Sequence, residues 1–251
     1  MKRLIVNGDD FGRSAGVNAG VLEAHARGVV TSATVMVLEN AAARGIREVA
    51  ERARGLSLGL HFALTGGGAP ASAARGLPNV APGGRFRRTR EELPDSLPPE
   101  EVLLELEAQI GVFEVLARKP PSHLDSHHHV ALHPSVAPVF AAVARRRSLP
   151  VRSASDEARR SLRDAGVRTP DRFVDEFYGE SAGIETLERI LTELPDGTTE
   201  LMCHPGHPDA ELRQGSTYAE ERERETEVLC DPRIRALVRS RKIELIGFDR
   251  L

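Results

Sequence analysis

The chain has 251 residues, of which 40% are hydrophobic and only 4% aromatic, with no tryptophan. Its 34 basic and 37 acidic residues leave a net charge of −3, so no basic surface of the kind that binds nucleic acid is expected. Two cysteines, Cys203 and Cys230, give no disulfide framework, and no apolar stretch has the length of a signal peptide or a membrane span. We therefore expect a cytoplasmic protein with reduced thiols and with neither a nucleic-acid nor a membrane partner.

Short apolar strands alternate with longer helical segments along the chain. Helical spacing is clearest over 99–117, where Val102, Leu106 and Ile110 recur every four residues. Strict alternation predicts a parallel sheet with right-handed crossovers. We expect an α/β fold, a distorted (β/α) barrel of about seven strands forming a single domain over 1–251, although an open doubly wound sheet fits the same pattern. In chain order, strands are predicted near 3–7, 32–37, 56–61, 121–126, 149–152, 171–174, 199–203 and 242–247, and helices near 15–27, 41–53, 99–117, 134–147, 154–165, 181–193 and 217–239.

The segment 64–98 interrupts this alternation. It carries three consecutive glycines at 66–68, and six prolines fall from residue 70 to residue 99. A loop of this length within a compact domain is usually functional or disordered. Because this loop directly follows His61, we predict a flap over the substrate, with a solvated insertion as the alternative. The side chains available to an anionic substituent of the substrate would be Arg85, Arg87, Arg88 and Arg90.

Metal-binding residue types occur at the ends of four predicted strands. Asp9-Asp10 follows the first strand, His61 ends the third, and His127 and His204 follow two later strands. The carboxyl ends of parallel barrel strands share one face, where active sites are built. Singly, His61 could be a buried core histidine, the aspartate pair a helix cap and the His-Pro-Gly stretch at 204–206 a turn. Their common position instead predicts one metal-dependent hydrolytic site.

The alternation of side chains along a strand selects among the five histidines of 123–133. Alternate residues share a face, so His123, Asp125 and His127 point to one side. If Leu124 packs outward, His127 is the inward histidine nearest the rim, and Asp125 orients a metal-bound imidazole from behind. Two imidazoles and one carboxylate leave coordination positions open, as in catalytic sites. This donor set favours Zn²⁺, Mn²⁺, Co²⁺ or Fe²⁺ over Mg²⁺.

Four segments of the sequence also carry a family resemblance. They are Val-Asn-Gly-Asp-Asp-Phe-Gly at 6–12, Gly-Leu-His-Phe-Ala-Leu-Thr at 59–65, His-Leu-Asp-Ser-His-His-His at 123–129 and Glu-Leu-Met-Cys-His-Pro at 200–205. These segments resemble the signature blocks of the YdjC-like carbohydrate deacetylases. Within that family the chain is most similar to the ChbG-type chitooligosaccharide deacetylases. Gly8, Ala131 and His207 depart from the family pattern, which leaves the length and decoration of the sugar open.

The resemblance implies a barrel, often a homodimer, that removes acetyl groups from N-acetylated amino sugars with a divalent cation. It implies that Asp10, His61 and His127 are the metal ligands, and that the metal is Mg²⁺. The expected substrate is a small oligosaccharide of the chitooligosaccharide class, such as diacetylchitobiose.

Hydrolysis of an amide further needs a base for water and an acid for the departing amine. We assign these roles to Asp9 and His204, by analogy with the polysaccharide deacetylases. The alternatives are a metal-dependent hydrolase of another bond, such as a phosphate ester, and a non-catalytic sugar-binding barrel. Simple binding would require neither Asp9 nor His204, which argues against the second.

Overall fold

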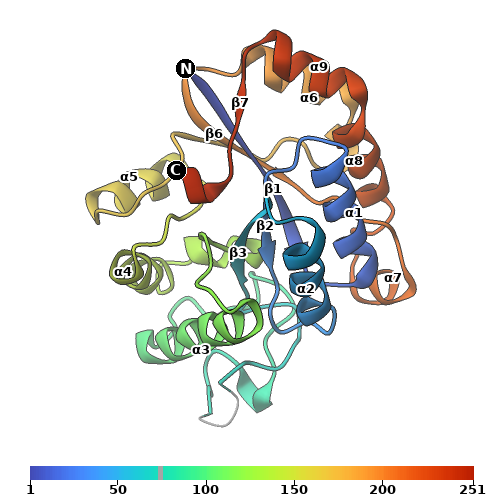
Figure 1. Ribbon diagram of the computed structural model, residues 1–251. Coiled ribbons are helices and arrows are strands. Elements are labelled where there is room, and N and C mark those ends of the chain that lie inside the picture. The colour runs from blue at the N-terminus through green and yellow to red at the C-terminus, as the bar shows by residue number, and fades with distance from the viewer. Residues whose placement is uncertain (73–75) are drawn as a thin grey trace. The chain divides into compact units, whose positions relative to one another are not determined.

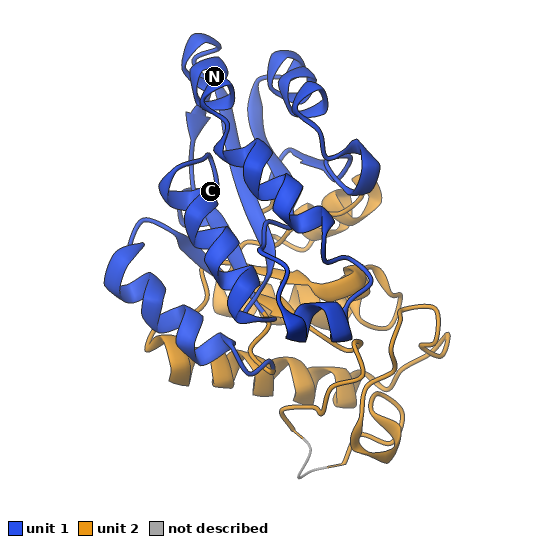
Figure 2. Ribbon diagram, turned by 90° about the vertical axis from the view of Figure 1, so that its right-hand side faces the viewer, with its two compact units in different colours: residues 1–35, 39–58, 170–251 blue, residues 36–38, 59–169 orange. Residues whose placement is uncertain are grey.

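The computed structural model describes residues 1–72 and 76–251 (Figure 1). The chain forms two compact units, coloured separately in Figure 2. Unit 1 comprises residues 1–35, 39–58 and 170–251, and unit 2 comprises residues 36–38 and 59–169. The described residues include seven strands, and the strands pair in parallel. The predicted α/β class, with a parallel sheet of about seven strands as in a distorted (β/α) barrel, is thereby confirmed.

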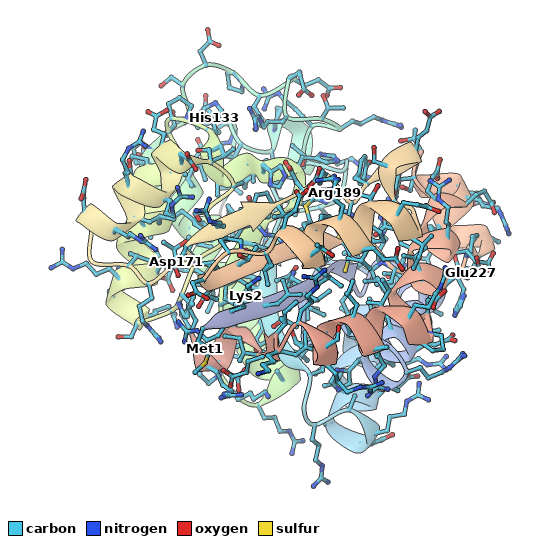
Figure 3. The ribbon with its side chains drawn as sticks, turned by 90° about the horizontal axis from the view of Figure 1, so that it is seen from above. Met1, Lys2, His133, Asp171, Arg189 and Glu227 are labelled. Atoms are coloured by element: carbon cyan, nitrogen blue, oxygen red, sulfur yellow. The ribbon has the colours of Figure 1, made fainter. Side chains whose placement is uncertain are left out.

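The strands of unit 1 are arranged around one long central strand. This strand, β1, pairs with β2 and β6 on its two sides and, near its start, with β7. Its apolar run Leu4-Ile5-Val6 is fully buried, as expected for a parallel strand covered on both faces. Met1, Lys2 and Asp171, labelled in Figure 3, lie near the amino-terminal end of these strands. The strands are β1 (Lys2–Phe11), β2 (Ser32–Val35), β5 (Arg172–Val174), β6 (Gly197–Cys203) and β7 (Glu244–Leu245).

Six helices belong to unit 1 among the described residues. Helix α1 packs on α8, and α6 packs on α9 (Figure 1). Ser14 caps α1, because its side chain accepts a hydrogen bond from the Val17 amide. The single helix predicted over 217–239 is instead two helices. Pro232 cannot donate to a continuing helix, and Asp231 caps the second one. The helices are α1 (Ala15–Ala26), α2 (Ala42–Arg52), α6 (Ile184–Glu193), α7 (Ala210–Gly215), α8 (Glu221–Cys230) and α9 (Pro232–Ser240).

Unit 2 contains the end of β3 (Ser57–Phe62), which starts in unit 1, and β4 (Leu124–Ser126). These strands pair in parallel with His61 opposite Asp125. Helices α3 (Pro99–Ala117), α4 (Ala137–Arg147) and α5 (Asp156–Asp164) complete the unit, and α3 packs against α4. The strand predicted at 149–152 is reduced to one bridge between Leu124 and Val151. Among the described helices, none has the length and apolar character that a membrane crossing requires.

The predicted loop over 64–98 lies in unit 2, and its residues 73–75 are outside the described residues. The described part is held to the rest of the unit rather than standing clear of it. Ser72 donates to Glu105, Asn79 donates to Glu101, and both acceptors lie on α3. Arg87 donates to the Asn79 carbonyl at 2.7 Å and Arg90 donates to the His129 carbonyl at 3.5 Å, so two of the four arginines are hydrogen-bonded within the unit. The role of the loop as a flap stays a prediction.

Candidate functional site

The aspartate pair lies within β1 rather than after it, which corrects the predicted end of this strand near residue 7. The pairing of β1 with β2 shifts register between Gly8 and Phe11, and Asp10 has a φ of 62°. An irregularity of this kind changes the direction in which side chains point, and such irregularities are common next to active sites. Asp9 and Asp10 are 2% and 5% exposed, so both carboxylates are held in a buried, irregular segment of an otherwise regular strand.

Asp9 and His204 lie next to each other in unit 1. His204 directly follows β6, whose Cys203 pairs with Gly8 of β1. This register places His204 Nε2 4.0 Å from Asp9 Oδ2. The other carboxylate oxygen of Asp9 accepts a hydrogen bond from Asn7 Nδ2 at 2.8 Å. The two side chains predicted as base and acid are therefore brought together by neighbouring strands.

Asp10 has a buried cationic partner from a distant part of unit 1. Arg222 of α8 donates from Nη2 to Asp10 Oδ2 at 2.5 Å, and Arg222 is 3% exposed. Arg222 Nη1 has no hydrogen-bond partner among the described residues. An ion pair this deeply buried costs desolvation of both groups, so it fixes geometry more than it adds stability.

Helix α8 also holds the chain around His204. Glu225 Oε2 accepts from the His204 backbone amide at 2.5 Å, and Thr226 Oγ1 accepts from the Gly206 amide at 2.9 Å. Glu225 is fully buried, and burial raises the pKa of its carboxyl to about 7, although hydrogen bonds from the His204 amide and the Tyr218 hydroxyl act in the opposite direction. One helix thus anchors both the Asp10 carboxylate and the loop that carries His204.

In unit 2, His61 is oriented by a carboxylate. Its Nδ1 lies 2.7 Å from Asp125 Oδ1, and Asp125 Oδ2 accepts from Arg152 Nη1 at 2.9 Å. The three side chains are at most 5% exposed. Because Asp125 takes Nδ1, the nitrogen of His61 that would bind a metal is Nε2. Asp125 therefore has the position behind an imidazole that the alternation of side chains predicts.

His127 directly follows β4, as predicted, and begins a short 3-10 turn over His127–Leu132. One of its ring nitrogens lies within 4.8 Å of one of His61, and the ring centroids are 5.5 Å apart. His128 stacks on His127 with centroids 3.8 Å apart, and its Nδ1 lies 3.0 Å from Thr65 Oγ1. His128 and His129 both have a φ of 51°, so the turn has left-handed backbone at non-glycine residues. The turn thus brings His127, of the triple cluster, to His61.

A cavity of about 760 Å³ opens in unit 2 beside these residues. Asp125, His129 and Arg152 line part of its wall, and residues of α4, α5 and the segments before these helices line the rest. Pockets of this size are typical of small-molecule sites. The carboxylate that orients His61 is therefore at the wall of a cavity rather than in a closed core.

Each unit thus carries candidate metal-ligating groups: Asp10 and Asp9 belong to unit 1, and His61, His127 and Asp125 belong to unit 2.

Sequence reasoning missed Arg222 and Glu225. They lie in the Glu-Arg-Glu-Arg-Glu run at 221–225, which is typical of an exposed helix. One signal could have found them. Arg222 lies four residues before Thr226 and Glu225 lies four residues before Leu229, and residues four apart share a helix face, so both charged side chains lie on the buried face of α8.

Comparison with known proteins places the chain among carbohydrate-modifying enzymes. A family model described as YdjC-like protein matches residues 3–240. A carbohydrate deacetylase of Brevibacillus brevis is 37% identical over 252 residues, covering 99% of both chains. A chitooligosaccharide deacetylase of Serratia marcescens is 38% identical over 257 residues, covering 100% of this chain and 99% of the other.

Solved structures share the fold. A crystal structure of an Enterococcus faecalis protein, described as a candidate cellobiose-phosphate cleavage protein, matches with a TM-score of 0.93 and 32% identity. The match covers 99% of this chain and 98% of the other. A family 4 acetyl xylan esterase from Clostridium thermocellum matches with a TM-score of 0.53 and 14% identity, covering 99% and 89%. The second likeness is one of fold alone.

Proposed function

Because the chain belongs to the YdjC-like protein family, we propose that it is a metal-dependent carbohydrate N-deacetylase acting on N-acetylated amino sugars of the chitooligosaccharide class. The observation that carries the proposal is the buried Asp9 beside His204, 4.0 Å apart at the ends of neighbouring strands. A carboxylate and an imidazole at this separation can serve as the base and the acid of an amide hydrolysis. The names of the curated relatives support the acetylated sugar as substrate.

The cation is proposed to be held by Asp10, His61 and His127. The donor set fits a divalent metal, because it offers one carboxylate and two imidazoles, one of which is oriented by Asp125. Imidazole donors favour Zn²⁺, Mn²⁺ or Co²⁺, and the family resemblance favours Mg²⁺. A bound cation would lower the pKa of a water and polarise the acetyl carbonyl.

The chain's own residues supply the proton transfers. Asp9 accepts the proton of the attacking water, and Asn7 holds the other oxygen of this carboxylate in place at 2.8 Å. His204 donates a proton to the amine nitrogen as it leaves the acyl carbon. Glu225 fixes the backbone of His204, and Arg222 fixes Asp10, so both strand ends are held before substrate arrives.

The test is loss of acetyl groups, followed by mass spectrometry, from mono- and di-N-acetylated glucosamine sugars with and without a 6-phosphate. We expect acetyl loss with a divalent cation and none with a chelator. Asp9→Asn should lower turnover by about 100-fold or more while the purified protein keeps its metal content. His127→Ala should lose metal and activity together, and Asp164→Asn, at an exposed position on α5, should lose neither.

Other outcomes would identify a different function. Release of phosphate without loss of acetyl would identify a phosphate-ester hydrolase. Sugar binding with no chemical change, at any metal, would identify a non-catalytic barrel. If Asp9→Asn protein purifies without metal, the roles of base and ligand are wrongly assigned.

A further inference from the structure

Both tyrosines of the chain lie at one place in unit 1. The sequence contains two tyrosines and no tryptophan. Tyr178 follows β5, Tyr218 precedes α8, and their rings stack with centroids 4.3 Å apart and planes 9° apart. The His204 ring meets both edge-on, at 5.3 Å from Tyr178 and 5.7 Å from Tyr218. Both tyrosines of the chain therefore contact His204, the proposed catalytic acid.

The inner ring of this stack is fixed. The Tyr218 hydroxyl donates to Glu225 Oε1 at 2.5 Å and accepts from the Gly179 amide at 2.9 Å. The guanidinium carbon of Arg222 lies 5.6 Å from the centroid of the same ring, a cation–π distance. Because Gly179 follows Tyr178 in the chain, the same hydroxyl also holds the backbone beside the outer ring. Tyr218 thus holds Tyr178 in place through ring stacking and through the hydrogen bond to the Gly179 amide.

The outer ring is open. Tyr178 is 45% exposed, and among the described residues the other exposed large hydrophobic side chains are Met1, Leu103 and Val115. None of those three contributes to the contacts around His204. The exposed part of the Tyr178 ring, on a fixed support beside the proposed catalytic acid, therefore offers an aromatic surface to a ligand.

A pyranose ring matches such a surface chemically. Its axial C–H groups form an apolar face, and its hydroxyl groups form a polar rim. The face of an aromatic ring carries negative charge density and attracts C–H groups placed above it. A flat platform therefore takes a sugar ring while leaving its polar substituents free for other contacts.

We propose that Tyr178, supported by Tyr218, is the platform on which one ring of the amino-sugar substrate stacks next to His204. The inference rests on the proposed deacetylase function and adds to it a residue that determines binding of the sugar. The aromatic face carries the effect, so the hydroxyl of Tyr178 is dispensable. Tyr178 is a binding residue and takes no part in proton transfer.

Steady-state kinetics with diacetylchitobiose separates binding from turnover. Tyr178→Ala should raise KM by about three- to tenfold, the range expected for loss of one aromatic stacking contact, with kcat within about twofold of wild type. Tyr178→Phe should keep both constants, because it keeps the ring. Val115→Ala, which truncates an exposed side chain on α3, is the matched control and should also keep both. An unchanged KM in Tyr178→Ala, or an equal loss in Tyr178→Phe, would overturn the proposal.

Intrinsic fluorescence gives a second readout, because without tryptophan all the ultraviolet emission of tyrosine type comes from this stack. Titration of Asp9→Asn protein with diacetylchitobiose should change the emission in a saturable way. In the double variant Asp9→Asn, Tyr178→Ala, in which Tyr218 is the remaining emitter, half of the emission change should require about three- to tenfold more sugar. If wild-type protein releases acetate, but its emission does not change with sugar and Tyr178→Ala leaves KM unchanged, the platform is wrong and the proposed deacetylase function stands. If it releases no acetate from any sugar, the function itself is wrong.

Discussion

Replacing Glu225 with glutamine should remove a pH dependence of stability that this one carboxyl creates. The pKa of Glu225 is raised from its ordinary 4.5 to about 7, chiefly because the side chain is fully buried. A carboxyl whose pKa is higher in the folded chain than in the unfolded chain binds its proton more tightly when folded. Its contribution to stability is therefore complete below pH 4.5 and is lost as the pH rises through about 7.

The magnitude follows from the difference between these two pKa values. At about 1.4 kcal/mol per pH unit, the loss for a fully buried group is about 3 kcal/mol. Glutamine imitates the protonated carboxyl. Its oxygen can accept from the His204 amide, and its nitrogen can donate to the Tyr218 hydroxyl oxygen, so both hydrogen-bonding positions remain occupied. Glu225→Gln should consequently be close to wild type near pH 4.5 and more stable above pH 7.

The assay is urea unfolding of both proteins at pH 5 and pH 8, with a chelator present because a bound metal adds its own pH dependence. The advantage of Glu225→Gln in the free energy of unfolding should grow by about 2–3 kcal/mol between the two pH values. Glu227→Gln is the matched control, since Glu227 lies on the same helix, is exposed, and is labelled at the outside of α8 in Figure 3. The reasoning fails if the difference between wild type and Glu225→Gln is flat with pH, or grows in favour of wild type.

Three further predictions concern unit 2. Asp125→Asn should weaken binding of Mn²⁺ about 10- to 100-fold in calorimetric titration, because the carboxylate orients His61; an unchanged affinity would remove Asp125 from this role. Gly59→Ala should lower the free energy of unfolding by about 1–3 kcal/mol, because its Cβ would lie 2.5 Å from the His123 ring. Gly111→Ala, in α3, should raise it by about 0.5–1 kcal/mol, because apart from the adjacent residues and the nearby helix backbone no atom lies within 4 Å of the added Cβ. If the denaturant midpoints of both alanine variants shift in the same direction from wild type, the packing described is contradicted.

The predictable parts of the fold are those with strong local patterns. Helix α3 was predicted over 99–117 and occupies Pro99–Ala117, because its apolar spacing and its helix-forming residues agree. The order of strands and helices was also predictable, except for the strand near 149–152, the unpredicted helix α7 and the division of 217–239 into two helices, and so was the position of His127 directly after β4. The break at Pro232 was visible in the sequence, and the error was to extend one helical pattern across a residue that cannot continue it.

The parts that escaped prediction depend on contacts between distant residues. The irregularity in β1 at Asp10 results from its pairing with β2, and no local pattern marks it. Arg222 looks solvent-exposed among its charged neighbours, and only its partner Asp10, 212 residues earlier, makes it part of the site. The strand predicted near 149–152 has the right residues but only a single bridge to β4. Contacts with residues distant in the sequence decide such features, and the residues near them in the chain favour neither outcome.

The interleaving of the two units along the chain has a consequence for synthesis. Unit 2 is nearly continuous, over 59–169, whereas unit 1 is completed only by residues 170–251. Strand β1 emerges first from the ribosome, but its partner β6 follows almost 200 residues later, so a long loop must close before this pairing forms. Unit 2 is therefore synthesised while β1, with its buried Asp9 and Asp10, still lacks its partners β6 and β7. During this interval the apolar run Leu4-Ile5-Val6 of β1 is exposed, and this is when aggregation and chaperone binding compete with assembly of the proposed catalytic pair.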